Sequence, residues 1–204
     1  GFVAPELTEL IEGSLVAGIR QMAWQRAPFA ALWVVMEDGR LFSMTYRRER
    51  EVVAWAAHPM PGAAVESVCV TNGSNGYDEV WLAVRRTVNG STVRHLEQLD
   101  TATHLALFAG NRDALTYLDC AKRVTVATPA QEFAGFGHLE GELVSVTADN
   151  AAHPQCRVNG GVIRLQYPAS SVLAGIAYES AVTPMPLDAQ MQDGTAQGRK
   201  MRLA

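Results

Sequence analysis

The residues able to do chemistry in this chain of 204 residues are scattered and do not stand at motif spacing. His138 and Glu140 form the His-x-Glu half of a zinc deaminase signature, whose other half is Pro-Cys-x-x-Cys. The sequence has one partial match to this second half, Pro154-Gln155-Cys156, and it lacks the second cysteine. The five histidines show no metal-ligand spacing, so we interpret them as polar surface residues: His58, His95, His104, His138 and His153. The sequence therefore predicts no metal site.

Nucleotide and catalytic motifs are also missing from the sequence. Three glycines are spaced GxGxxxG where a dinucleotide site needs GxGxxG: Gly135, Gly137 and Gly141. A glycan hydrolase needs two carboxylates across a cleft. Glu140 and Glu142 are too close along one strand, and the neighbours Asp78 and Glu79 would point to opposite faces of a strand. We expect no catalytic residues, no cofactor and no enzymatic activity.

The three cysteines, Cys69, Cys120 and Cys156, form no CxxC pair, and we interpret them as reduced structural thiols. No signal-peptide pattern follows Gly1. The two Asn-x-Ser sequences coincide with expected hairpin turns, so we interpret both as turns rather than glycan sites: 72–74 and 89–91.

The composition is that of a globular protein, with 48% hydrophobic and 19% charged residues. Seventeen basic and 21 acidic residues give a net charge of −4, which argues against a general nucleic-acid binder. No apolar run approaches the roughly 20 residues needed to span a bilayer, so we expect no membrane span.

The elements that must position any site are strands. Six strand-like runs recur at intervals of about ten residues, with turn signals such as Asp38-Gly39 and Asn89-Gly90 between them. The runs are 31–36, 41–46, 52–56, 65–71, 79–86 and 92–97. This spacing predicts an antiparallel β-meander, either propeller-like or a sandwich.

A second group of strand-like runs follows residue 119, at 120–128, 142–148, 155–158, 162–167 and 172–178. The whole is therefore expected to be all-β and mainly antiparallel, with few short helices and a small β-barrel or sandwich domain after the meander. We divide the chain into an N-terminal segment with short helical character, the meander domain, a connector, the small β domain and an extended tail: 1–22, 23–102, 103–118, 119–183 and 184–204.

Exposed aromatic and basic residues are the candidates for an interaction surface. Trp33 and Trp81 lie in apolar strand centres, and we expect core packing for both. The candidate interaction surface is Trp24, Tyr46, Trp55, Arg199, Lys200 and Arg202. The basic cluster at the chain end could contact an acidic neighbour or DNA phosphates.

Several segments, taken in order, resemble a family of tailed-phage structural proteins, the phage stabilisation or tail tubular protein B-like family that forms the nozzle of short tails. The resemblance runs from about Ala23 to Arg202 and includes 24–26, 32–35, 38–39, Leu41, 44–46, 53–55, 65–68, 78–82, 84–90, 94–97, 138–142, 159–161, 167–170, 193–195 and 197–200. Family chains continue on both sides, so we expect a fragment of a longer chain.

The resemblance implies a structural virion protein without enzymatic activity. It would form a homo-oligomeric ring, hexameric in the whole protein, that surrounds the DNA exit channel and contacts the head–tail connector and other tail proteins. DNA would only pass through, and a net negative charge fits such passage because Lys and Arg are what retain DNA. The implied location is the virion tail, and the host cytoplasm during assembly. The alternative is a carbohydrate- or receptor-binding β module of a phage tail, with Trp24, Tyr46 or Trp55 as the platform.

Overall fold

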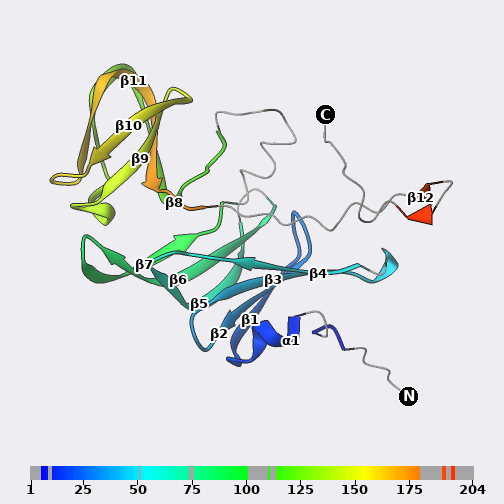
Figure 1. Ribbon diagram of the computed structural model, residues 1–204. Helices are drawn as coiled ribbons and strands as arrows, with labels where there is room; N and C mark the ends of the chain where they lie inside the picture. The colour runs from blue at the N-terminus through cyan, green and yellow to red at the C-terminus, as the bar shows by residue number, and fades with distance from the viewer. Residues whose placement is uncertain are drawn as a thin grey trace.

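The computed structural model describes residues 6–8, 11–50, 52–73, 76–100, 110, 114–179, 190–191 and 194–195 (Figure 1). Arg199, Lys200 and Arg202, part of the predicted interaction surface, lie outside these residues. The prediction of an all-β, mainly antiparallel fold is confirmed. Within the described residues, helical structure is limited to short pieces such as α1 (Glu12–Leu15) and the 3₁₀ turns Arg48–Arg50 and Gly137–Leu139. None of the helices in the described part of the chain is long and apolar enough to cross a bilayer.

The first sheet is an antiparallel meander in the order β1-β2-β3-β4. Its strands are β1 (Ile19–Gln25), β2 (Ala31–Met36), β3 (Leu41–Arg47) and β4 (Val52–His58). β1 was not predicted as a strand. It is an edge strand in which only Gln25 is buried, so polar and apolar residues do not alternate clearly.

The second sheet has the order β5-β6-β7, with β5 (Ala63–Asn72), β6 (Asp78–Val88) and β7 (Ser91–Gln98). The first two sheets share one buried core, so the meander forms a sandwich and not a propeller-like blade. The core residues are Ala31, Trp33, Val35, Leu41, Val65, Val68, Val80, Leu82 and Val84. We refer to β1–β7 as the first lobe.

The second lobe is a four-stranded antiparallel sheet in the order β10-β9-β11-β8, with its own core around Phe133, Phe136 and Ile163. Its strands are β8 (Asp119–Ala134), β9 (Leu143–Ala148), β10 (Ala151–Arg157) and β11 (Val162–Ile176). β11 is continuous where the sequence indicated two strands, because it bends at a bulge between Arg164 and Ala169. A short pair, β12 (Gln190–Met191) and β13 (Gly194–Thr195), follows. Figure 1 shows the second lobe beside the β7 side of the first.

Candidate functional site

The three aromatic residues predicted for an interaction surface lie on one face of the first sheet. Pairing between the strands places Trp24 opposite Leu32, Leu32 opposite Met44 and Met44 opposite Trp55. Directly paired residues point to the same face of a sheet, so these four form a row across all four strands. Tyr46 lies two residues beyond Met44 and therefore shares that face. We call this surface, with Met22, the aromatic face.

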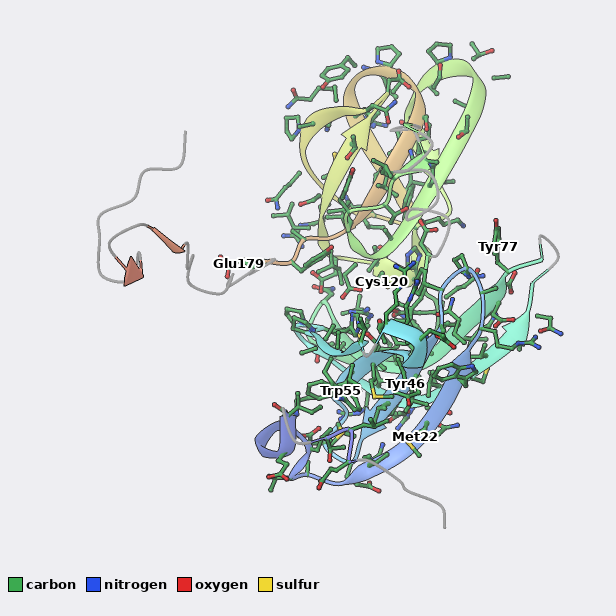
Figure 2. All side chains as sticks on the ribbon, turned by 90° about the vertical axis from the view of Figure 1, so that its right-hand side faces the viewer. Met22, Tyr46, Trp55, Tyr77, Cys120 and Glu179 are labelled. Carbon is green, nitrogen blue, oxygen red and sulfur yellow. The ribbon has the colours of Figure 1, made fainter. Side chains whose placement is uncertain are left out.

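The aromatic face is the side of the first sheet opposite the sandwich core. Leu15 of α1 and Trp55 pack with Val34, Met36 and Phe42 in a small cluster at its centre. Trp55 donates its indole N–H to the carbonyl oxygen of Leu7 at 2.8 Å, so it is partly covered by the N-terminal segment. Figure 2 shows Met22, Tyr46 and Trp55 on the first lobe, below Cys120.

The β1 end of the aromatic face is open to solvent. Met22 is 55% and Trp24 44% exposed, and both belong to an edge strand. A strand edge leaves backbone N–H and C=O groups without partners in its own sheet. Exposed apolar side chains beside such an edge are typical of a protein–protein contact.

The other two tryptophans do not contribute to this face. Trp33 is buried, as predicted, and donates its indole N–H to Gln25 Oε1 at 2.9 Å. Trp81 is half-buried and donates to Glu79 Oε2 at 3.2 Å. The expectation of core packing is therefore confirmed for Trp33 and wrong for Trp81, which lies outside the buried core and lines a cavity on the other side of its sheet.

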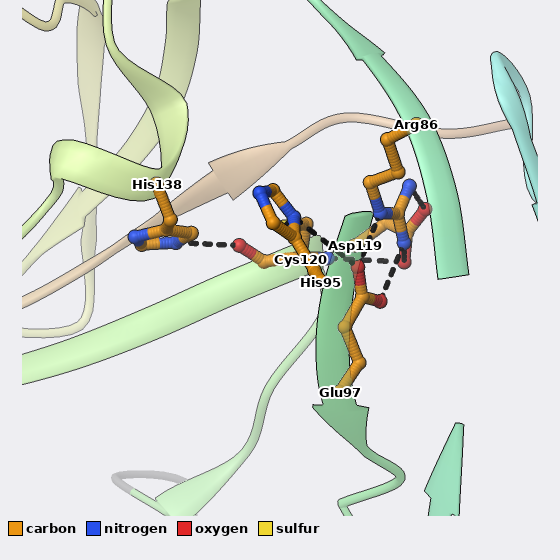
Figure 3. A network of polar contacts seen from close by, with 6 residues as sticks. All are labelled: Arg86, His95, Glu97, Asp119, Cys120 and His138. Atoms are coloured by element: carbon orange, nitrogen blue, oxygen red, sulfur yellow. Dashed lines mark hydrogen bonds and ion pairs between the residues drawn. The ribbon is translucent and has the colours of Figure 1, made fainter. Parts of the chain in front are cut away.

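A second polar site joins the two lobes (Figure 3). Arg86 on β6 is buried and reaches Glu97 on β7 and Asp119 at the start of β8. Its guanidinium contacts Glu97 Oε2 at 2.7 Å and both Asp119 oxygens at 2.8 Å. One arginine thus binds a carboxylate from each lobe in paired hydrogen bonds.

The charge of Arg86 is stabilised within this junction. Burial alone would lower the pKa of its guanidinium, but the hydrogen bonds and charges of Glu97 and Asp119 outweigh burial and raise that pKa. Arg86 therefore carries its positive charge throughout the ordinary pH range. With two carboxylates facing one guanidinium, the junction keeps one negative charge in excess.

A cavity of about 1260 Å³ opens beside this junction and is lined by both lobes. His58, Trp81 and His95 line it from the first lobe, and Cys120 and His138 from the second. Burial, with the charge of Glu97, raises the pKa of the Cys120 thiol to about 12. A thiol in this state is protonated near neutral pH and is not an activated nucleophile.

The two parts of the deaminase-like pattern do not come together. His138 Nε2 lies 3.2 Å from the carbonyl oxygen of Cys120. Because a carbonyl oxygen only accepts, this ring nitrogen carries a hydrogen and donates it. Glu140 accepts hydrogen bonds from the backbone N–H groups of Gly160 and Gly161. The Cys156 thiol instead contacts the carbonyl oxygen of Arg164 at 3.3 Å. Both fragments therefore act in local structure.

Sequence reasoning missed the side chains that converge at the junction. His95 and Glu97 alternate with exposed residues along β7 and so share one face, and Cys120 approaches them from β8. The His-x-Glu pair at 95–97 was the available signal, but its partner lies in another lobe, 23 residues after Glu97. Among the described residues, these three are the group whose donor atoms are close enough to hold a metal ion.

Known proteins provide no assignment for this chain. No protein-family model matches it, and no curated protein matches it significantly.

Proposed function

We propose that this protein is a structural subunit of a phage or prophage tail, part of a ring around the DNA exit channel. The observation that carries the proposal is the aromatic face, which leaves Met22 and Trp24 exposed on an edge strand. Burial of such side chains is favourable at about 25 cal/mol per Å² of apolar surface. The partner is a neighbouring copy of the same chain.

Ring formation sets a geometric requirement for that contact. A ring needs a heterologous interface, in which the edge of one subunit meets a different surface of the next. Among the described strands β1 pairs only with β2, so it is an edge strand next to apolar side chains, and both features are suited to such a contact. The phage tail itself is inferred from the resemblance over residues 23–202.

Sedimentation velocity between about 1 and 200 μM, followed by negative-stain microscopy, tests this proposal. We expect concentration-dependent closed rings with a central opening. Met22→Lys should abolish them, because its charge would have to be buried in the interface. Leu143→Lys is the matched control, since Leu143 is 50% exposed on β9 in the second lobe, and rings should survive this change.

Three outcomes would overturn the proposal, two of which concern the oligomer itself. One is a monomer at every concentration, and the other is an oligomer that Met22→Lys leaves intact. Open or irregular aggregates, without a ring, would also contradict it.

Exposure of Trp24 favours a second candidate, a carbohydrate- or receptor-binding module. Trp24 and Trp55 are three strands apart, or about 14 Å at the usual strand spacing, so one flat ligand could contact both. Binding on a glycan array that is lost in Trp24→Ala, in a protein that stays monomeric, would support this candidate over the first.

A further inference from the structure

Three side chains of different chemistry meet where the second lobe joins the first. They are His95 and Glu97 of β7 and Cys120 of β8, each half-buried. Imidazole, carboxylate and thiolate are the three ligand types that zinc accepts in proteins. Calcium and magnesium prefer oxygen ligands, so the thiol favours zinc over both.

The distances between the donor atoms fit a tetrahedral ion. Cys120 Sγ lies 3.5 Å from His95 Nδ1, and His95 Nδ1 lies 3.7 Å from Glu97 Oε1. All three donor atoms lie within 4.8 Å of one another. Zinc bonds of about 2.3 Å to sulfur and about 2.0–2.2 Å to nitrogen and oxygen place neighbouring ligands about 3.3–3.6 Å apart. Only small side-chain movements would bring the three around one ion.

The backbone around Cys120 places its thiol toward β7. Cys120 has a φ of +49°, in the left-handed region that non-glycine residues seldom adopt. Its N–H donates to Asp119 Oδ1 at 3.0 Å, and its carbonyl oxygen accepts from His138. Three polar contacts therefore surround this residue, including the one between its thiol and His95 (Figure 3).

The charges at the junction also favour a divalent cation. Arg86 carries one positive charge, and Glu97 and Asp119 carry two negative charges between them. When the Cys120 thiol coordinates the ion it releases its proton to solvent, and the resulting thiolate adds a third negative charge, so a dication makes the group neutral. Arg86 binds both oxygens of Glu97, Oε1 through Nε at 2.5 Å and Oε2 through Nη2 at 2.7 Å, and so holds the carboxylate in place, as hydrogen-bonding partners do for ligands in known metal sites. Oε1 would bind the ion through its remaining lone pair.

From these observations we propose that His95, Glu97 and Cys120 bind a zinc ion between the two lobes. Three protein ligands leave a fourth position on the side of the inter-lobe cavity, where a solvent molecule or an anionic ligand can bind. The bound ion would link β7 to β8 directly, in addition to Arg86. This site is independent of ring assembly, because it lies away from the aromatic face.

The test is titration of the purified full chain with CoCl₂, monitored by absorption, and with ZnCl₂, monitored by calorimetry. We expect one ion per chain and a thiolate-to-cobalt charge-transfer band in the near ultraviolet. Cys120→Ser should remove this band. Cys120→Ser and His95→Gln should each weaken zinc binding by more than about 100-fold, since loss of an outer hydrogen-bond partner alone costs 10- to 100-fold.

Matched controls separate this site from the other thiols and imidazoles. Cys69→Ser changes an exposed cysteine, and His58→Gln changes a histidine that lines the same cavity outside the cluster. Both should bind zinc as the unchanged protein does. Zinc should also raise the melting temperature of the unchanged protein but not that of Cys120→Ser, with far-ultraviolet circular dichroism to verify that each variant folds. A charge-transfer band that persists in Cys120→Ser, or no one-to-one binding at all, would overturn the proposal.

Discussion

Arg86 joins carboxylates that come from different lobes. Its side chain is 1% exposed, and those of Glu97 and Asp119 are 15% and 19% exposed. Removal of one partner from a buried ion pair leaves charge without compensation, which is far more costly than loss of a surface pair. The adjacent Arg85 offers a comparison, because its side chain is 50% exposed and pairs with Glu66 at 3.5 Å.

We expect Arg86→Leu to lower the free energy of unfolding by about 3 kcal/mol, the low end for a broken buried pair because both carboxylates keep some contact with water. Arg85→Leu should lower the free energy of unfolding by less than about 1 kcal/mol. Urea denaturation monitored by circular dichroism measures both. Equal losses in the two variants would contradict a special role for the buried guanidinium.

At the scale of elements, the turn between β2 and β3 is fixed by its contact with β5. Gly39 has a φ of +86°, and its carbonyl oxygen accepts from the N–H of Val65 at 2.9 Å. A Cβ at Gly39 would lie 2.7 Å from the Cβ of Ala64. Gly90, in the turn between β6 and β7, has a similar φ of +76° with open space around it.

Gly39→Ala should therefore destabilise the protein more than Gly90→Ala. Both variants carry the cost of a left-handed alanine, about 1–2 kcal/mol. Gly39→Ala adds the overlap with Ala64, about 1–3 kcal/mol for forced repacking. The difference between the urea midpoints of the two variants measures the steric overlap between the new Cβ and Ala64. Equal midpoints would contradict a close contact at Gly39.

Asp78 fixes the segment after β1 to the start of β6. Its Oδ2 accepts the N–H groups of Arg26 at 2.6 Å and Ala27 at 3.2 Å. The hydrogen bond from Arg26, helped by that from Ala27, lowers the pKa of Asp78 although its burial acts in the opposite direction. Since the folded pKa is below the unfolded value of about 3.9, this stabilisation is complete above that value and is lost as pH falls through the folded pKa.

Asp78→Asn should therefore lower the melting temperature at pH 7 and flatten its decrease in acid. Melting temperatures between about pH 2.5 and 7 measure the effect, with the ordinary aspartate pKa of about 3.9 inside that window. Glu49→Gln, at an exposed position in the turn before β4, should leave the acid profile unchanged. If the melting temperatures of Asp78→Asn and the unchanged protein fall in parallel as the pH is lowered, Asp78 does not contribute to acid stability in this way.

The sequence predicted most of these elements, because buried strands separated by strong turn residues leave a clear pattern. β2 was predicted at its observed bounds, and the Asn89-Gly90 turn stands where expected. β1 was missed because edge strands bury few side chains. That Trp24 and Trp55 lie on the same face of the sheet could not be predicted from the sequence, because it depends on the register of three strand pairs. His95 and Cys120 meet only through the packing of the two lobes.

At the scale of the whole molecule, charge limits what the surface can bind. The chain carries a net charge of −4, and several of its arginines are paired with carboxylates. Attraction between basic side chains and phosphates accounts for nearly all non-specific DNA binding. If the proposed role in a DNA exit channel holds, this surface should bind the passing DNA weakly.

We expect duplex DNA to bind with a Kd above about 10⁻⁴ M at physiological salt, weaker than the usual non-specific range. Fluorescence anisotropy of a labelled duplex, read at low and physiological salt, measures it. Micromolar binding that weakens steeply with salt would reveal a basic surface and argue against simple passage of DNA.

The three cysteines also differ in how easily reagents can reach them. Cys69 is exposed on β5, Cys120 is half-buried against His95, and Cys156 is buried with its thiol pKa raised by desolvation. A maleimide dye at neutral pH should therefore attach to Cys69 first, without any engineered residue. The native chain thus carries, at Cys69 on a strand of the second sheet, its own position for a single fluorophore or spin label, which would report the spacing between copies in the proposed ring.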